Sequence, residues 1–225
     1  VDPVTGNVTL ETIKAAVEAT SFKVRAIAVV HLGGRPCELV AISAYAKSIG
    51  AYLVEDACHA PLAEYTDLAG AAFKVGSCAH SDVATLSFHA IKHITAGEGG
   101  VLLTNSDNLA KRALLLRSHG MVRDPSELRN QDNAGAPWYY EMHELGYNYR
   151  LSEVSCALAF NQVLRLEKNN LRRQEIAALY HQHLQLRALR ARALRPGPPP
   201  QHHRRHAHTR PVEAAARRGL RGGRA

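Results

Sequence analysis

The chain has 225 residues, which suits one full-sized domain or a domain with part of a second. No apolar run approaches the roughly 20 residues that cross a bilayer, and residues 1–5 lack a basic leader, so we expect neither a membrane span nor a secretory signal. The formal net charge of +8 comes from the tail, because residues 184–225 hold 11 arginines and one acid while the rest holds 17 basic and 19 acidic residues. The charge therefore gives no reason to predict specific nucleic-acid binding.

The four cysteines are scattered and form no C-x-x-C pair, which favours reduced thiols in a cytoplasmic protein over a disulfide framework. Two of the cysteines lie near histidines, but the spacing fits neither a zinc finger nor a catalytic zinc site. This set comprises Cys58, His59, Cys78, His80, His89 and His93. We therefore expect a cytoplasmic protein without a metal site.

The first 56 residues predict a strand–helix–strand unit that follows a short helix. Thr9 can cap a helix over 10–19, in which apolar residues recur on one face. An apolar strand over 24–30 leads through a glycine turn to a helix that Pro36 opens and that ends near residue 49. A second strand over 51–56 follows, and this order predicts a βαβ unit in a parallel sheet.

The remaining elements extend the same pattern. Residues 60–82 predict a loop with a short strand, and residues 121–145 predict a loop rich in polar and aromatic side chains. The predicted strands are 83–88 and 100–104, and the predicted helices are 107–118, 152–169 and one that ends near 184. The expected fold class is α/β, a mostly parallel sheet flanked by helices.

The composition changes after residue 184. Residues 185–225 are rich in Arg, Pro, Ala, Gly and His, and the proline run at 196–200 breaks any helix. We expect a disordered tail here, separate from a folded domain over 1–184. A shifted reading frame in GC-rich coding DNA would produce this residue set.

Lys92 is the candidate around which the chemistry can be built. It is the only charged residue between Asp82 and Glu98, and it lies between a strand and a glycine-rich turn. Asp56 and Ser87 lie near the ends of predicted strands, and ligands gather at the carboxyl ends of such strands. A lysine amine, a carboxylate and a hydroxyl match the needs of pyridoxal phosphate: a covalent anchor, a partner for the ring nitrogen and a phosphate donor.

Five motifs occur in an order that resembles the DegT/StrS-type sugar-nucleotide aminotransferases, which have the type I pyridoxal-phosphate fold. They are 55–60 (EDACHA), 87–92 (SFHAIK), 97–100 (GEGG), 117–120 (RSHG) and 146–151 (GYNYRL). The resemblance covers roughly residues 1–184. Within the family, 137–150 is most similar to the 4-aminotransferases of pseudaminic acid biosynthesis, which aminate a UDP-linked 4-keto-6-deoxy-N-acetylhexosamine with glutamate as donor.

The resemblance implies a role for each matched position. Lys92 would form the Schiff base and move the proton between the substrate carbon and the cofactor, and Asp56 would pair with the pyridine nitrogen. His59 would lie beside the cofactor ring, and Ser87 would bind the phosphate. Asn148 would reach the cofactor phosphate of a neighbouring subunit, which implies a homodimer with shared sites.

Two departures leave alternatives open. Family members begin earlier, with a phosphate-binding glycine turn, and continue into a smaller C-terminal domain, so we expect this chain to be truncated at both ends. A fragment of this kind could be inactive and serve only in dimerisation or regulation. The related sugar 3-dehydratases keep the fold and cofactor but carry histidine where this chain has Lys92.

Overall fold

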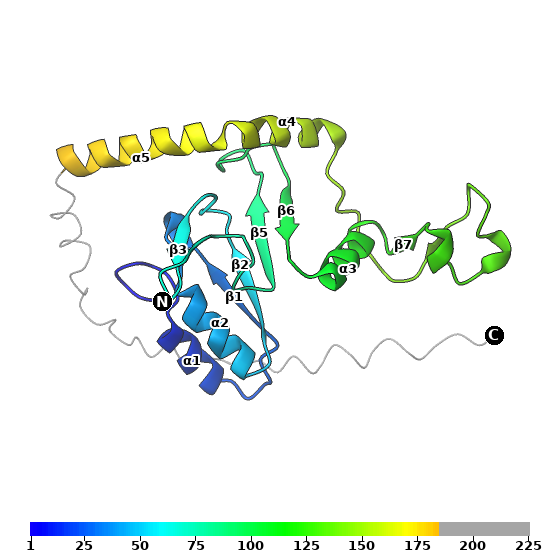
Figure 1. The fold of residues 1–225 in the computed structure, drawn as a ribbon, viewed down its shortest axis with the longest axis horizontal. Helices are drawn as coiled ribbons and strands as arrows, with labels where there is room; N and C mark the ends of the chain where they lie inside the picture. Colours follow the sequence, from blue (N-terminus) through cyan, green and yellow to red (C-terminus); the bar gives the residue numbers. More distant parts are fainter. Residues whose placement is uncertain (185–225) are drawn as a thin grey trace, which may run out of the picture.

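The computed structural model describes residues 1–184, and the predicted tail over 185–225 lies outside the described residues (Figure 1). Its main sheet has the strand order β1-β2-β5-β6, with β1, β2 and β5 parallel and β6 antiparallel to β5. The strands are β1 (Ala26–Val30), β2 (Tyr52–Asp56), β5 (Val83–Ser87) and β6 (Gly100–Leu103). The four predicted strands and the α/β class are therefore confirmed.

Helices α1 (Leu10–Glu18) and α2 (Leu39–Ser48) pack with the first two strands around one apolar core. Thr9 caps α1 as predicted, since its hydroxyl accepts a hydrogen bond from the Thr12 N–H and the Thr12 hydroxyl accepts one from the Thr9 N–H. The fully or nearly fully buried side chains of this core include Ile13, Ile27, Val29, Leu39, Ile42, Ala46 and Leu53.

The predicted start of α2 at Pro36 is wrong, because the helix begins at Leu39. The backbone N–H of Cys37 donates to Nδ1 of the buried His31 at 3.0 Å. Residues 36–38 therefore lie before the helix, where the backbone of Cys37 is bonded to His31.

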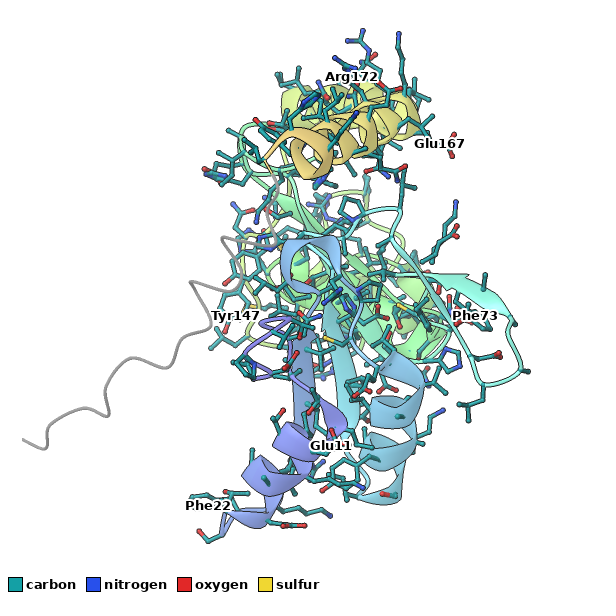
Figure 2. All side chains as sticks on the ribbon, turned by 90° about the vertical axis from the view of Figure 1, so that its left-hand side faces the viewer. Glu11, Phe22, Phe73, Tyr147, Glu167 and Arg172 are labelled. Carbon is teal, nitrogen blue, oxygen red and sulfur yellow. The ribbon has the colours of Figure 1, made fainter. Side chains whose placement is uncertain are left out.

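Residues 60–82 form more structure than the predicted loop with one strand. Strands β3 (Glu64–Thr66) and β4 (Ala72–Lys74) pair as an antiparallel hairpin. In Figure 2 the label of Phe73, a residue of β4, marks this hairpin at the right edge of the molecule. The Asp67 carboxylate accepts from the N–H groups of Ala69 and Ala71 and so holds the tight turn. These side-chain hydrogen bonds explain why a stretch of mixed composition forms a hairpin.

Helix α3 (Asp107–Arg117) starts at the Ser106 cap and leads into a segment with little regular structure, as predicted. Two very short strands, β7 (Met121–Val122) and β8 (Glu141–Met142), pair across this segment. Two 3-10 turns, η2 (Pro125–Glu127) and η3 (Gln131–Asn133), lie between them.

Helices α4 (Glu153–Leu164) and α5 (Leu166–His183) continue one another as a long rod that crosses above the arrowhead of β5 (Figure 1). The backbone leaves ideal helix geometry at Arg165, so the predicted 152–169 helix ends earlier and α5 starts at Leu166. The rod formed by α4 and α5 therefore lies over the carboxyl end of β5.

Among residues 1–184, no helix is both long enough and apolar enough to span a membrane.

Candidate active site

The sheet places Asp56 and Ser87 at neighbouring strand ends. Asp56 is the last residue of β2 and is in register with Thr85 of β5, two residues before Ser87. Lys92 lies in the loop that follows β5, which Phe88 closes by donating its N–H to the Gly99 carbonyl at 2.8 Å. The carboxyl edge of the sheet therefore carries the carboxylate, the hydroxyl and the amine that the sequence predicted for one site.

The Asp56 carboxylate is held in its ionised form. Burial raises its pKa, but hydrogen bonds from Cys58 and the positive charges of His59 and Lys92 outweigh burial, so the pKa lies below its usual value. Oδ1 of Asp56 accepts from the Cys58 N–H at 3.1 Å, which orients the carboxylate. His59 and Lys92 therefore lie close enough for their charges to act on the Asp56 carboxylate, although neither forms an ion pair with it.

A cavity of about 800 Å³ opens beside these residues, a volume in the range of small-molecule sites. Lys92 and His59 line it, whereas Asp56, Ser87 and Asn148 are not among the lining residues in the described part of the chain. The other lining residues come from the turn at 33–36, from 58–64, from Ile91 and His93, and from Asn170 and Gln174 of α5. Four separate segments of the sequence therefore share this cavity.

One lysine lines the cavity, and an arginine lies near it. Burial lowers the pKa of His93, and the charges of Arg173, His59 and Lys92 lower it further. Glu64 is the acid on the cavity wall. Lys92 and the nearby Arg173 place positive charge at the cavity, which favours an anionic ligand.

Ser87 is fixed by close backbone packing. Its Oγ accepts from the His89 N–H at 3.3 Å, so the hydroxyl proton remains available for donation to a ligand. Its strand partner is Gly100, and a Cβ at that position would stand 2.6 Å from the Leu86 carbonyl oxygen. A side chain at residue 100 would therefore push β6 away from Ser87.

Asn148 lies outside the cavity. It is exposed and forms a β-bridge with Ser118, and its sequence neighbours Tyr147 and Tyr149 stack on each other with ring centroids 4.8 Å apart. Both tyrosines are more than half exposed. The described residues of one chain thus do not bring Asn148 to Lys92.

The cavity does not support thiol or metal chemistry. Burial and the neighbouring Asp56 carboxylate raise the pKa of Cys58 to about 11, so this thiol stays protonated near neutral pH. Across the described range 1–184, no three His, Cys, Asp or Glu side chains are grouped to hold a metal ion.

Sequence reasoning missed two features of the site. The first is the buried pair formed by His31 and Glu55, which could have been suspected from a charged residue placed inside the apolar strand 52–56. The second is the contribution of Asn170 and Gln174, two amides four residues apart on one helix face. No local pattern indicates that this helix returns over the strand ends.

Comparison with known proteins places this geometry in context. A UDP-4-amino-4,6-dideoxy-N-acetyl-beta-L-altrosamine transaminase from Campylobacter jejuni is 39% identical over 175 residues, which are 78% of this chain and 42% of that protein. The aminotransferase TlmJ from Streptoalloteichus hindustanus superposes with a TM-score of 0.66 at 32% identity, over 81% of this chain and 43% of that one. PseC from Helicobacter pylori, an aminotransferase in the biosynthesis of pseudoaminic acid, gives a TM-score of 0.60 at 26% identity, over 74% and 39%.

The chain therefore spans about two-fifths of the length of these relatives. The profile of the DegT/DnrJ/EryC1/StrS aminotransferase family matches residues 1–219. The order of the motifs, the mostly parallel sheet and these matches agree. The chain belongs to the DegT/DnrJ/EryC1/StrS aminotransferase family.

Proposed function

We propose that this chain carries the cofactor centre of a pyridoxal-phosphate-dependent aminotransferase, with Lys92 as the covalent anchor. The observation that carries the proposal is the position of Asp56 at the carboxyl end of β2 and of Lys92 on the wall of the cavity at the same edge, near enough for the lysine charge to lower the pKa of Asp56. Aminotransferases of this family depend on pyridoxal phosphate, and the lysine and the carboxylate are the two groups that its aldehyde and its ring nitrogen require.

The residues present fit that cofactor. The ionised Asp56 carboxylate can hold the ring nitrogen protonated, and the imidazole of His59 can flank the ring from the cavity wall. The Ser87 hydroxyl can donate to the phosphate, next to the positive charge of the cavity. When bound, pyridoxal phosphate supplies an electron sink that stabilises negative charge on the substrate carbon.

Lys92 also serves as the group that moves a proton. Lys92 lines the cavity, on a loop held by the hydrogen bond from its own backbone N–H to the His89 carbonyl at 2.9 Å. The free amine of Lys92 could take the proton from the substrate carbon and deliver it to the cofactor. Retention of this lysine and the transaminase relatives favour transamination over sugar 3-dehydration.

The proposed substrate is a nucleotide-linked 4-keto-6-deoxy sugar, and the proposed amino donor is an amino acid such as glutamate. The support is the name of the Campylobacter jejuni relative, a transaminase for a UDP-linked amino sugar, together with the positive environment of the cavity, which suits a diphosphate. A role in pseudaminic acid biosynthesis is the specific form of this proposal.

The active form is proposed to be a homodimer in the cytoplasm. Support for the dimer comes from the exposed Asn148, which stands between two exposed tyrosines, and from the many exposed apolar side chains of α4. The four free cysteines support a reducing compartment.

We also propose two units along the chain, a partial aminotransferase domain over 1–184 and a separate tail over 185–225.

An inactive fragment is the second candidate. The observation that favours it is length, because the chain covers 42% of the Campylobacter jejuni relative. In that case the chain would act at most through association with other chains. Stabilisation by pyridoxal phosphate distinguishes the two, since a ligand that binds only the folded state raises the melting temperature.

The decisive experiment is an absorbance titration of the 225-residue chain with pyridoxal phosphate. We expect a new band from the Lys92-bound cofactor, which is lost in Lys92→Ala and kept in Lys74→Ala, an exposed lysine on β4. A band of equal strength in the folded Lys92→Ala variant would overturn the assignment.

A further inference from the structure

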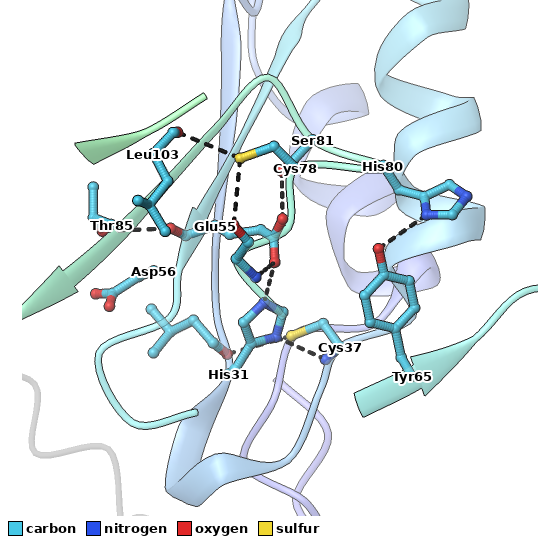
Figure 3. A network of polar contacts seen from close by, with 12 residues as sticks. His31, Cys37, Glu55, Asp56, Tyr65, Cys78, His80, Ser81, Thr85 and Leu103 are labelled. Carbon is cyan, nitrogen blue, oxygen red and sulfur yellow. Dashed lines mark hydrogen bonds and ion pairs between the residues drawn. The ribbon is translucent and has the colours of Figure 1, made fainter. Parts of the chain in front are cut away.

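A polar pair, His31 and Glu55, is completely buried next to Asp56 (Figure 3). His31, after β1, and Glu55, in β2, have relative exposures of 0%, and Nε2 of His31 lies 3.1 Å from Oε2 of Glu55. The proposed chemistry assigns neither side chain a role. A buried carboxylate is costly unless it is fully hydrogen-bonded, so the pair calls for an explanation.

The Glu55 carboxylate accepts three hydrogen bonds. Oε2 accepts from His31 and from the Gly76 N–H at 3.1 Å, and Oε1 accepts a short hydrogen bond from the Ser81 hydroxyl. Burial raises the pKa of Glu55, but these three donors together outweigh burial and hold the pKa below its usual value. The carboxylate is thus ionised and fixed from three directions.

The histidine has one possible tautomer in this setting. Its Nδ1 accepts from the Cys37 N–H at 3.0 Å, so the ring proton lies on Nε2 and is donated to Glu55. The imidazole therefore links the start of α2 to the middle of the sheet. Through Glu55 the same network also holds the 76–81 loop.

His31 is also tied directly to Asp56. The backbone N–H of His31 donates to the Asp56 carbonyl at 3.2 Å, while its side chain holds the adjacent Glu55. On the other side of the strand end, the Ala57 N–H donates to the Thr85 carbonyl of β5 at 2.9 Å. The peptide that carries the Asp56 carboxylate is therefore clamped on both sides.

We propose that His31 and Glu55 are positioning residues, which fix the end of β2 so that the Asp56 carboxylate meets the ring nitrogen of the cofactor held by Lys92. This inference rests on the proposed function. Consecutive residues of a strand face opposite sides of the sheet, so holding Glu55 on the buried side sets the direction of Asp56 on the open side. A carboxylate that must meet one atom requires such support from outside the binding site.

The test compares Glu55→Ala, Glu55→Gln and wild type in the full 225-residue chain. Two quantities are measured: the dissociation constant of pyridoxal phosphate, and the pH midpoint of the absorbance band of the bound cofactor, which reports the interaction with Asp56. For Glu55→Ala we expect binding weaker by at least about tenfold, the factor for loss of one charge-assisted contact, and a midpoint displaced in the same direction as in Asp56→Asn.

Glu55→Gln is the conservative rescue. Its amide oxygen can accept from His31 and Gly76, and its NH2 can face the Ser81 hydroxyl, which accepts as well as donates. We expect both quantities to stay within about threefold and a few tenths of a pH unit of wild type. That result would assign the role to geometry and not to the charge of Glu55.

Ile42→Val is the matched control, because Ile42 is fully buried in the neighbouring core and touches none of the network hydrogen bonds. It should lower the melting temperature and leave both quantities unchanged. If Glu55→Ala does not fold, Ser81→Ala removes a single donor and should displace both quantities in the same direction by less.

The outcomes separate the two proposals. If wild type shows no band that depends on Lys92, the proposed function fails, and the positioning role fails with it. If wild type shows the band and the folded Glu55→Ala or Ser81→Ala variant matches Ile42→Val, only the positioning role is overturned, and the network serves stability alone.

Discussion

The two faces of β2 carry consecutive carboxylates with different surroundings. Glu55 faces the core, is fully buried and accepts from three donors of the protein itself. Asp56 faces the open edge and accepts a hydrogen bond from the Cys58 N–H, and the charges of His59 and Lys92 lower its pKa. The core side satisfies its carboxylate completely, whereas the edge side leaves hydrogen-bonding capacity for a ligand. A strand can thus hold a structural acid and a binding acid in adjacent positions.

The largest effect should come from removing the acid on the core side. Glu55→Ala leaves the donors of His31, Gly76 and Ser81 without their acceptor, and we expect a loss of about 3–5 kcal/mol in the free energy of unfolding. Urea denaturation measures it. A loss below that of Ile42→Val, about 0.5–1.5 kcal/mol, would contradict the assigned importance of the three bonds.

The acid on the edge side should show the opposite profile. Asp56→Asn keeps an oxygen that can accept from the Cys58 N–H, so we expect the free energy of unfolding to change by less than about 1 kcal/mol. Binding of pyridoxal phosphate should weaken by roughly 10–100-fold, because the ring nitrogen loses its charged partner. Fluorescence titration and urea denaturation of the same preparation measure the two effects. Equal losses in both would remove the distinction between the faces.

Glu141 tests whether hydrogen bonds alone can hold a carboxylate near the surface. The N–H groups of Arg129 and Asn130 and the side chains of Tyr139 and His143 surround it, and the backbone bonds lead in lowering its pKa to about 2. The lowered folded pKa means that this stabilisation is complete above the unfolded value of 4.5 and is lost as the pH falls toward 2.

Amide hydrogen exchange provides the readout for that segment. Between pH 5 and pH 3, after correction for the intrinsic exchange rate, protection at Arg129 and Asn130 should fall, because both N–H groups donate to Glu141. In Glu141→Gln the fall should be absent, since no proton is gained. Unchanged protection in wild type would show that the segment is held by other contacts.

The smallest effect should come from a largely exposed acid on α5. Glu175 pairs with Arg172 across one turn of α5 at 2.8 Å, and both side chains are more than 60% exposed, with Arg172 pointing outward in Figure 2. Glu175→Gln should change the free energy of unfolding by at most about 0.5 kcal/mol, and less in 1 M salt. A change above about 1 kcal/mol would mean that α5 is packed more tightly than its exposure indicates.

The sequence was sufficient for the fold wherever local patterns and packing agree. The strands over 26–30 and 52–56 bury every second residue against the core, and Thr9 and Ser106 cap helices as their side-chain chemistry predicts. The prediction failed at Pro36, where a backbone N–H from the next residue binds His31 and delays the helix. It also failed at the 64–74 hairpin, whose turn depends on one aspartate.

The candidate site was predictable in its motif-bearing residues and not in its surroundings. Asp56 and Lys92 are marked by strand ends and by isolation in the sequence, and their roles remain predictions. The His31–Glu55 network joins positions 24 residues apart, and the cavity wall from α5 lies about 80 residues beyond Lys92 in sequence. Such contacts depend on how the elements pack, which no local period encodes.

The double attachment of His31, to Glu55 by its ring and to Asp56 by its backbone, has an evolutionary consequence. A lineage that changes only one member of the buried pair passes through an intermediate with an unsatisfied polar group. A joint replacement by well-packed apolar side chains avoids that intermediate and can be neutral for stability. Residues 31 and 55 should therefore vary together across related sequences, whereas residue 56 should vary only with a change of chemistry.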